Sequence, residues 1–273
     1  MDQPHVIALH CSGGGGSQWR HLRRVLPDQT PLWCPHFIGS PWTGHWSGQH
    51  AFMLADEAAP IVAMIDSLGA RVHLVGHSYG AAVALRVARE RPNRIASMVL
   101  YEPTALHVLS AAGPEEQAAL AEVGILSAVL DRLILAGDHR TAAQQFVEYW
   151  NGPGAWPALR EEAQADVIHY MPKACLDFRA LRFERTPFAV YRHFGCPVLL
   201  LTGQHTRELT RLIARQLARS LRFGLPQTVD GAGHMGPVTH PDAVAALMAG
   251  FIQRHADTGV AEEPAAARYR RAA

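Results

Sequence analysis

The sequence predicts a doubly wound α/β fold, with a mainly parallel sheet of about six strands and an inserted helical segment. Short apolar runs rich in Val, Ile and Leu alternate with longer helix-like patterns, as in βαβ units whose strands are covered on both faces. The alternation stops between residues 104 and 193 and resumes afterwards. With 48% hydrophobic and 18% charged residues, the 273-residue chain has the composition of an ordinary globular protein.

The strands and helices of the sheet domain follow from hydrophobic periodicity. Apolar runs bounded by turn residues predict six strands, and apolar residues spaced three and four apart predict five helices. The strands are expected at residues 6–10, 32–35, 72–75, 96–101, 198–202 and 227–229. The helices are expected at residues 17–26, 53–68, 79–90, 207–221 and 241–255.

The interval from residue 104 to residue 193 is helix-like throughout. Its apolar residues recur at helical spacing, which predicts an inserted helical cap. The Gly152-Pro153-Gly154 turn and the two prolines Pro157 and Pro172 are expected to divide it into hairpin-like helices. The predicted organisation is a core of residues 1–103 and 194–256, a cap of residues 104–193, and a mobile tail of residues 257–273 without apolar periodicity.

Charge and cysteine content exclude several classes of protein. The formal net charge is +1 and the basic residues form no run outside the tail, so nucleic acid is not an expected partner. The four cysteines are widely separated and form no CxxC pair, which predicts neither a disulfide framework nor a zinc site. Three histidines crowd one segment without a metal-ligand pattern, so no metal is expected either; these are His36, His45 and His50.

No targeting signal or membrane span is expected. The N-terminus has an acidic residue where a secretory signal would be basic, and no apolar run reaches the ~18 residues that a span requires. We therefore expect a cytoplasmic protein that binds a small-molecule substrate and neither nucleic acid nor membrane. A homodimer is compatible with the sequence.

The stretch VHLVGHSYGAAVAL, residues 72–85, carries the strongest chemical signal. Gly76, Ser78 and Gly80 have G-x-S-x-G spacing between a predicted strand and a predicted helix. In that context the serine lies on a sharp, strained turn with its hydroxyl exposed, and larger residues in place of the glycines would collide with neighbouring backbone. Ser78 is therefore predicted to be a nucleophile.

Several further stretches make the chain resemble the serine-nucleophile branch of the α/β-hydrolase superfamily. They are LHCSGGGG, VGHSYGAA, VLYEP, VLLLTG and GAGHMGP, and they span most of the chain. The resemblance implies a nucleophile, an acid and a histidine in that order. His234, in the glycine-rich loop before the last helix, is then the expected base that takes the Ser78 proton.

The acid has two candidate positions. Many relatives carry Asp three residues after the glycine that ends the VLLLTG strand, but this chain has Thr206 there. The superfamily also uses the end of the strand after the nucleophile helix, where this chain has Glu102. Glu102 is the preferred candidate for the acid. Glu208, two residues after Thr206, is the alternative.

The four consecutive glycines after the first predicted strand fit an oxyanion loop better than a phosphate loop. Counting from Gly13 and Gly15, the last position of a dinucleotide fingerprint is Gln18, and no Lys-Ser or Lys-Thr pair follows. The resemblance implies that the amides of Ser12 and Tyr79 bind the oxyanion. Relatives often have His-Gly where this chain has His10-Cys11, so Cys11 stays an alternative donor.

The expected activity is that of a cofactor-free serine hydrolase acting through an acyl-enzyme. A small ester, thioester, lactone or activated carbon-carbon bond is the expected target. Cys11 and the aromatic residues of the 35–50 loop, Trp42 above all, are expected to contact substrate, although Phe37, Trp42 and Trp46 also fit simple packing. Acyl transfer on the same residues and a low-turnover ligand-binding protein are the alternatives.

Overall fold

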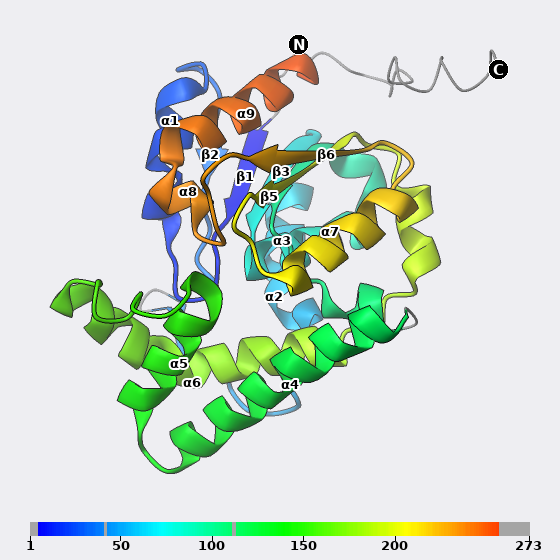
Figure 1. Cartoon of the computed structure of the whole chain (residues 1–273). Helices are drawn as coiled ribbons and strands as arrows, with labels where there is room; N and C mark the ends of the chain where they lie inside the picture. The colour runs from blue at the N-terminus through cyan, green and yellow to red at the C-terminus, as the bar shows by residue number, and fades with distance from the viewer. Residues whose placement is uncertain (1–4, 41–42, 111–112, 257–273) are drawn as a thin grey trace.

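A parallel sheet of six strands forms the centre of the computed structural model, which describes residues 5–40, 43–110 and 113–256 (Figure 1). The strand order is β2-β1-β3-β4-β5-β6, and every neighbouring pair is parallel. The predicted fold class is therefore confirmed. The strands are β1 (His5–Leu9), β2 (Leu32–Trp33), β3 (Val72–His77), β4 (Ile95–Tyr101), β5 (Val198–Gly203) and β6 (Gly224–Val229).

The central strands are apolar on both faces because both faces are covered. Every residue of β3 and β4 is buried, which explains why their sequences are nearly continuous apolar runs. The edge strand β6 begins at Gly224, three residues before the predicted start at Gln227. The added residues Gly224–Pro226 have poor strand propensity, but they pair with β5 from Val198 to Leu200, so tertiary pairing overrides local preference.

Helices cover both faces of the sheet. On one face α1 (Arg20–Val25) packs against α9 (Pro241–Arg254), and alternate strand residues such as Val75 and Val99 lie beneath them. The other face is covered by three helices, α2 (Leu54–Leu68), α3 (Tyr79–Glu90) and α7 (Glu208–Ser220). The helix expected at residues 17–26 is divided into a 3₁₀ turn at Gly16–Trp19 and the short α1.

Three long helices follow β4 and precede β5, where the inserted helical segment was expected. They pack on one another and lie across one end of the sheet, below the core in Figure 1. We call α4, α5 and α6 the cap helices. The segment comprises η3 (Leu106–Leu109), α4 (Pro114–Leu135), α5 (His139–Asn151), α6 (Glu161–Phe183) and η4 (Phe188–His193).

The predicted break at Pro172 is wrong. Pro172 lies inside α6, which continues from Glu161 to Phe183 without interruption. A proline within a helix loses one backbone hydrogen bond and costs about 3 kcal/mol. The turns on both sides of Pro172 are anchored in the core by buried residues such as Met171 and Ala174, so tertiary packing offsets that cost. The Gly152–Gly154 turn and Pro157, in contrast, do separate α5 from α6.

The sheet topology places a crevice at the carboxyl ends of β1 and β3. From β1 the chain crosses to β2 on one side, and it later returns to form β3 on the other side of β1. The loops that leave β1 and β3 therefore diverge, and such a switch point is where open α/β sheets bind ligands. Ser78 and the glycine-rich loop both lie there.

Two further expectations concern the C-terminal tail and the absence of a membrane-spanning segment. The mobile tail predicted at residues 257–273 lies outside the described residues. Among the helices of residues 5–40, 43–110 and 113–256, none has both the length and the apolar character needed to span a bilayer.

Candidate active site

Ser78 lies on a tight turn between β3 and α3. Its backbone has φ 55° and ψ −117°, a conformation that is rare and strained for a residue other than glycine. A Cβ at Gly76 would lie 2.5 Å from Ala81 Cα, and one at Gly80 would lie 2.4 Å from the His10 carbonyl oxygen. Both positions therefore exclude any side chain, as the predicted turn requires.

His234 and Glu102 continue a chain of hydrogen bonds that begins at Ser78. The Ser78 Oγ lies 2.9 Å from His234 Nε2, and His234 Nδ1 lies 2.7 Å from Glu102 Oε2. All three side chains are buried. Because the carboxylate accepts the Nδ1 proton, Nε2 is the nitrogen that can accept the serine proton. We call these three residues the triad. Ser78 follows β3, Glu102 follows β4 and His234 follows β6, so the three meet at the carboxyl ends of the strands.

The loop that carries His234 is held from below by side chains of the core. His77 donates from Nε2 to the His234 carbonyl oxygen at 2.8 Å, and the Tyr101 hydroxyl donates to the Gly233 carbonyl oxygen at 2.7 Å. A Cβ at Gly236 would lie 1.9 Å from the Tyr101 hydroxyl oxygen, so glycine is required there. These two buried donors hold the backbone of Gly233 and His234 and thereby fix the position of the His234 imidazole.

Glu102 is held by donors from neighbouring elements. The Gly203 amide donates to Oε1 at 2.8 Å, and the Thr210 hydroxyl donates to Oε2 at 3.3 Å. Burial alone would raise the pKa of Glu102, but His234, Thr206 and the Gly203 amide together lower it below its ordinary value. Thr206, at the position where many relatives have Asp, has its hydroxyl 2.6 Å from that of Thr210.

Of the two acids considered from the sequence, only Glu102 contacts the histidine. Glu208 lies in the first turn of α7, where its carboxylate pairs with Arg211 at 2.7 Å. The Glu208 side chain is 46% exposed, whereas that of Glu102 is fully buried. Glu208 is therefore part of the solvated surface of α7.

A tryptophan of the cap stacks on His234. The rings of Trp150 and His234 lie 4.3 Å apart with an interplanar angle of 22°, and Trp150 belongs to α5. A face-on aromatic ring favours a cation over its π-system. Sequence alone does not single out Trp150, because its place in a helical pattern is indistinguishable from that of a core residue.

The glycine-rich loop and the start of α3 adjoin Ser78. Cys11 is buried, and burial raises the pKa of its thiol to about 12, which argues against a nucleophilic role. The Cys11 amide donates to Gln18 Oε1 at 3.4 Å. Tyr79 is the first residue of α3, where an amide has no acceptor within the helix. The Ser12 hydroxyl donates to Asp177 of α6 at 2.6 Å.

A small cavity opens above Ser78 between the core and the cap. Water-molecule centres can occupy about 40 Å³ of it, so it is narrow. Its wall is largely apolar, and no Lys or Arg is among the described residues that line it. The lining residues are Cys11, Ser12, Ser78, Tyr79, Thr104, Phe146, Trp150, Asn151, Asp177, Phe178, Leu181, His234 and Met235.

The aromatic residues of the loop after β2 serve packing where the structure describes them. The Phe37 ring lies 4.5 Å from that of His10 and 5.4 Å from that of Tyr79. The Trp46 ring lies 5.2 Å from that of Phe52, and neither Phe37 nor Trp46 lines the cavity. Trp42 lies outside the described residues.

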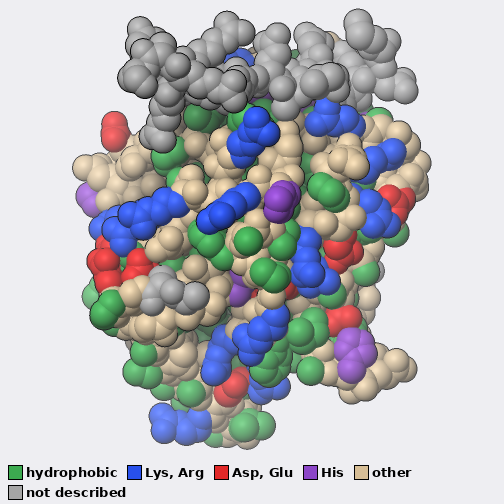
Figure 2. Space-filling view, turned by 90° about the vertical axis from the view of Figure 1, so that its right-hand side faces the viewer, with side chains coloured by type: hydrophobic (Ala, Val, Ile, Leu, Met, Phe, Trp, Pro, Cys, Tyr) green, Lys and Arg blue, Asp and Glu red, His purple; other side chains and the backbone are tan. Residues whose placement is uncertain are grey.

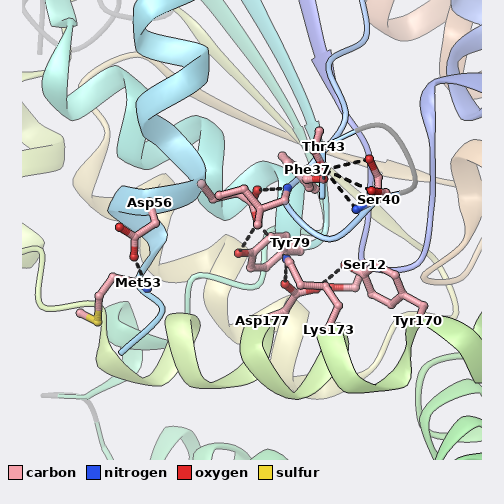
Figure 3. A network of polar contacts seen from close by, with 12 residues as sticks. Ser12, Phe37, Ser40, Thr43, Met53, Asp56, Tyr79, Tyr170, Lys173 and Asp177 are labelled. Carbon is pink, nitrogen blue, oxygen red and sulfur yellow. Dashed lines mark hydrogen bonds and ion pairs between the residues drawn. The ribbon is translucent and has the colours of Figure 1, made fainter. Parts of the chain in front are cut away.

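A second polar group, absent from the sequence analysis, lies beneath the glycine-rich loop (Figure 3). Lys173 of α6 donates to Glu57 Oε2 of α2 at 2.9 Å and also to Asp177 Oδ1. Asp177 Oδ2 accepts from the Ser12 and Tyr170 hydroxyls, each at 2.6 Å. We call the group the bridging network, because it joins the cap to the core; its members are Ser12, Glu57, Tyr79, Tyr170, Lys173 and Asp177.

The ions of the bridging network are shielded from solvent. Lys173 is 7% exposed, and Glu57 and Asp177 are each 1% exposed. Burial alone would lower the pKa of Lys173, but the two carboxylates raise it above its ordinary value, so the ammonium stays charged. Burial raises the pKa of Glu57, and the attraction of Lys173 offsets only part of that rise.

One sequence signal could have revealed this network. The chain has a single lysine, Lys173, and 24 arginines. Basic side chains are spread over the face shown in Figure 2, with acidic and hydrophobic ones between them. The only lysine of the sequence is therefore a buried residue.

Among the described residues, no group of three or more His, Cys, Asp or Glu side chains is placed to hold a metal ion. The histidines crowded in one segment, His36, His45 and His50, form no such group.

Comparisons with known proteins identify relatives of this chain and structures with the same fold. Pimeloyl-[acyl-carrier protein] methyl ester esterase of Methylococcus capsulatus is 28% identical over 257 residues, which cover 91% of this chain and 94% of that protein. Lipase LipV of Mycobacterium tuberculosis is 32% identical over 102 residues, so this match spans 36% of each protein. An alpha/beta hydrolase enzyme from a Medee basin deep-sea metagenome library superimposes with a TM-score of 0.78 at 15% identity, covering 96% of this chain and 93% of that structure.

The family itself is decided by a match over most of the chain. The sequence model of the alpha/beta hydrolase family matches residues 6–247, which include the six strands apart from His5, the cap helices and the triad. Relatives and structural neighbours are named as esterases, lipases and hydrolases. This chain is therefore an enzyme of the alpha/beta hydrolase family.

Proposed function

We propose that this enzyme hydrolyses small, uncharged carboxylic esters through a covalent acyl-enzyme on Ser78. The observation that carries the proposal is the unbroken hydrogen-bond chain from Ser78 through His234 to Glu102 at the base of an apolar cavity. No cofactor is needed, because nucleophile, base and oxyanion donors are all groups of the protein.

In the first half of the reaction, Ser78 Oγ attacks the ester carbonyl carbon and His234 Nε2 takes the hydroxyl proton. Glu102 keeps the Nδ1 proton of His234 in place and stabilises the imidazolium that forms. The carbonyl oxygen becomes an oxyanion. When the tetrahedral intermediate collapses, His234 returns the proton to the departing alkoxide, and the alcohol leaves with the acyl group bound to Ser78.

In the second half, water replaces the alcohol. His234 takes a proton from the water, the resulting hydroxide attacks the acyl carbon, and Ser78 Oγ is expelled and reprotonated by His234. The products are a carboxylic acid and an alcohol. The amides of Ser12 and Tyr79 bind the oxyanion in both halves, each contributing about 3 to 4 kcal/mol to the transition state. Ser12 is favoured over Cys11 because the Cys11 amide already donates to Gln18.

The cavity supports a small and uncharged substrate. A substrate carboxylate would need a cationic partner when buried, and no Lys or Arg belongs to the described lining. The space that water-molecule centres can occupy is only about 40 Å³, which favours a short acyl group. The same narrowness limits any acceptor in the second half to about the size of the alcohol that leaves, a limit that water meets.

A fluorophosphonate probe and an ester panel test the proposal. The probe should label Ser78, as located by mass spectrometry, and labelling should be absent in Ser78→Ala. With p-nitrophenyl esters of increasing chain length, kcat/KM should be highest for the shortest acyl groups and should fall as the chain lengthens. A wild-type enzyme that is neither labelled nor active on any ester would refute the proposal and favour a ligand-binding role.

A second panel tests the charge preference. Methyl esters of monocarboxylic acids should be better substrates than half-esters of dicarboxylic acids of equal chain length, because only the half-esters bring a carboxylate into the cavity. Equal or faster cleavage of the half-esters would contradict the proposed substrate class while leaving the serine mechanism intact.

A further inference from the structure

The bridging network ends at the two residues whose amides are proposed to bind the oxyanion. At one end, Asp177 accepts a hydrogen bond from the Ser12 hydroxyl at 2.6 Å. At the other end, Glu57 accepts one from the Tyr79 hydroxyl at 3.2 Å. Lys173 lies between the two carboxylates and donates to both, so a single side chain links the two sides of the proposed oxyanion hole.

We infer that Lys173 is a positioning residue that sets the geometry of the oxyanion hole and makes it depend on the docked position of helix α6. The inference rests on the proposed function. The hydrogen bonds of Lys173 go to Glu57 and Asp177, whereas Ser78 and His234 bond to each other. The inference therefore assigns a role to a residue outside the triad.

The cap supplies half of the network. Tyr170, Lys173 and Asp177 are spaced three and four residues apart, so they share one face of α6. In Figure 3 these side chains extend from the helix towards Ser12 and Tyr79. The core supplies the other half, from the loop after β1 and from α2 and α3. If α6 were to move away, Ser12 would lose the acceptor that holds its side chain.

The central position requires a cation. Without Lys173, the carboxylates of Glu57 and Asp177 would share a buried site with no charge to balance them, and such pairs are relieved by taking up a proton or by moving apart. Movement of Asp177 alters the acceptor for Ser12, and protonation or movement of Glu57 alters the acceptor for Tyr79. The loss of one distant charge would therefore be transmitted to both sides of the hole.

The shape of the site favours lysine over arginine. The stem of Lys173 packs on Gly39, where an added Cβ would lie 3.2 Å from Lys173 Cδ. The ammonium lies 4.8 Å from the ring centroid of Phe52 and 5.2 Å from that of Tyr79. This space suits a compact ammonium with three donors, whereas a planar guanidinium is wider. The use of the only lysine here follows from that restriction.

Lys173→Met tests the inference, because it keeps the length of the stem and removes the charge. Measured on a short ester well below the unfolding temperature, kcat should fall about 10- to 100-fold, less than the loss of an oxyanion donor outright. KM should change less than about threefold, since the substrate ground state makes little use of the hole. A trifluoromethyl ketone, which forms an oxyanion on Ser78, should bind more weakly by the same factor as kcat/KM falls.

Arg86→Met is the matched control. Arg86 of α3 pairs with Glu184 at the end of α6 at 3.2 Å, and Glu184 is only 4% exposed on its side chain. This ion pair also joins the cap to the core, but it does not contact Ser12 or Tyr79. Arg86→Met should lower the unfolding temperature and leave kcat and ketone affinity unchanged. If Lys173→Met and Arg86→Met reduced kcat equally, the effect would be loosening of the cap and the inference would be wrong.

Ser12→Ala keeps the inference testable even if Lys173→Met does not fold. It removes the hydroxyl that bonds Asp177 and leaves the Ser12 amide in the chain. We expect a smaller fall in kcat, about 3- to 30-fold, with a parallel loss of ketone affinity. Unchanged kcat and ketone affinity in Ser12→Ala would overturn the inference. If the wild type itself neither cleaves esters nor reacts with the fluorophosphonate, the proposed function fails and the inference fails with it. An active wild type with an equally active Lys173→Met refutes the inference alone.

Discussion

The triad and the bridging network both contain buried carboxylates, and Glu102 of the triad and Glu57 of the bridging network respond to burial in opposite ways. Hydrogen bonds lower the pKa of Glu102 despite its burial, whereas burial raises the pKa of Glu57 despite its contact with Lys173. Glu102 is held by an imidazole, a backbone amide and a hydroxyl. Glu57 lies near a second carboxylate, Asp177, so neighbouring charge adds to its desolvation.

The two groups also differ in what positions them. The triad and its donors come entirely from the ends of core strands, from the loops after them and from α7. The bridging network draws three of its six residues from helix α6. Nucleophile activation is therefore built into the sheet, whereas the support of the proposed oxyanion hole depends on the cap. Substitutions can separate these two contributions.

The largest effect is expected from breaking the triad at its nucleophile. Ser78→Ala should reduce kcat/KM for a short ester by at least ~10⁴-fold, because no other group can carry the acyl intermediate. The bridging network does not include the Ser78 side chain, so the unfolding temperature should stay close to that of the wild type. Ester kinetics and differential scanning calorimetry would check this. Activity that survives in Ser78→Ala would mean that another residue or a contaminant performs the reaction.

Glu102→Gln should have the next largest effect. Glutamine keeps the size of the side chain but can present its NH₂ group to His234, which favours the wrong tautomer, and kcat should fall by ~10³- to 10⁴-fold. Glu208→Gln is the matched control on the surface of α7 and should leave kcat unchanged. The reverse result, a large loss in Glu208→Gln and little in Glu102→Gln, would transfer the role of the acid to Glu208.

A smaller effect is expected where the cap meets the triad. Trp150 stacks on His234, and an aromatic face stabilises the imidazolium form by about 0.5 to 2 kcal/mol. In Trp150→Leu, kcat for a short ester should fall about 2- to 30-fold, because the imidazolium that forms on His234 in the transition state loses this stabilisation. Trp150→Phe, which keeps an aromatic face, should lose less. Equal losses of kcat in Trp150→Phe and Trp150→Leu would show that the stacked ring does not stabilise the imidazolium.

The smallest effect is on stability, and it contrasts the two carboxylates directly. Because the pKa of Glu102 is lowered by folding, its ionised form stabilises the fold above the ordinary carboxyl pKa, and this contribution is lost as pH falls through the lowered value. Because the pKa of Glu57 is raised, its contribution is present below the ordinary value and is lost as pH rises through the raised one.

Urea unfolding between about pH 4 and pH 7 would reveal these opposite slopes. Over that range, the stability of the wild type relative to Glu102→Gln should increase with pH, and its stability relative to Glu57→Gln should decrease. Lines of the same slope would show that the two carboxylates have similar environments. The proposed difference in electrostatic environment between Glu102 and Glu57 would then be wrong.

Local sequence predicted the geometry of the candidate site well where that geometry depends on local backbone. The Gly76-x-Ser78-x-Gly80 spacing encodes a turn that only glycine can flank, so the strained turn that carries Ser78 could be predicted directly. The preference for Glu102 followed from its place at a strand end, and the contact between Glu102 and His234 agrees with it. The role of each residue in catalysis stays a prediction for the experiments above.

The failures came from long-range packing. Pro172 was expected to end a helix, but burial on both sides of it keeps α6 continuous. Trp150 has the spacing of an ordinary helical residue, and although Lys173 stands out as the only lysine of the sequence, the partners that give each residue its place lie far away in the chain. Glu57 is separated from Lys173 by 116 residues, a distance over which no periodicity carries information.

The sequence by itself determined the succession of strands and helices along the chain, the strained turn at Ser78 and the residues from which a triad could be formed. These features depend on interactions between near neighbours in the chain, which the local pattern records. Only the tertiary structure decided which acid meets His234, which aromatic ring covers it and how one buried lysine joins the cap to the core. Those outcomes depend on which distant surfaces pack together and on how burial changes the energy of a charge, and neither is encoded in any single stretch of sequence.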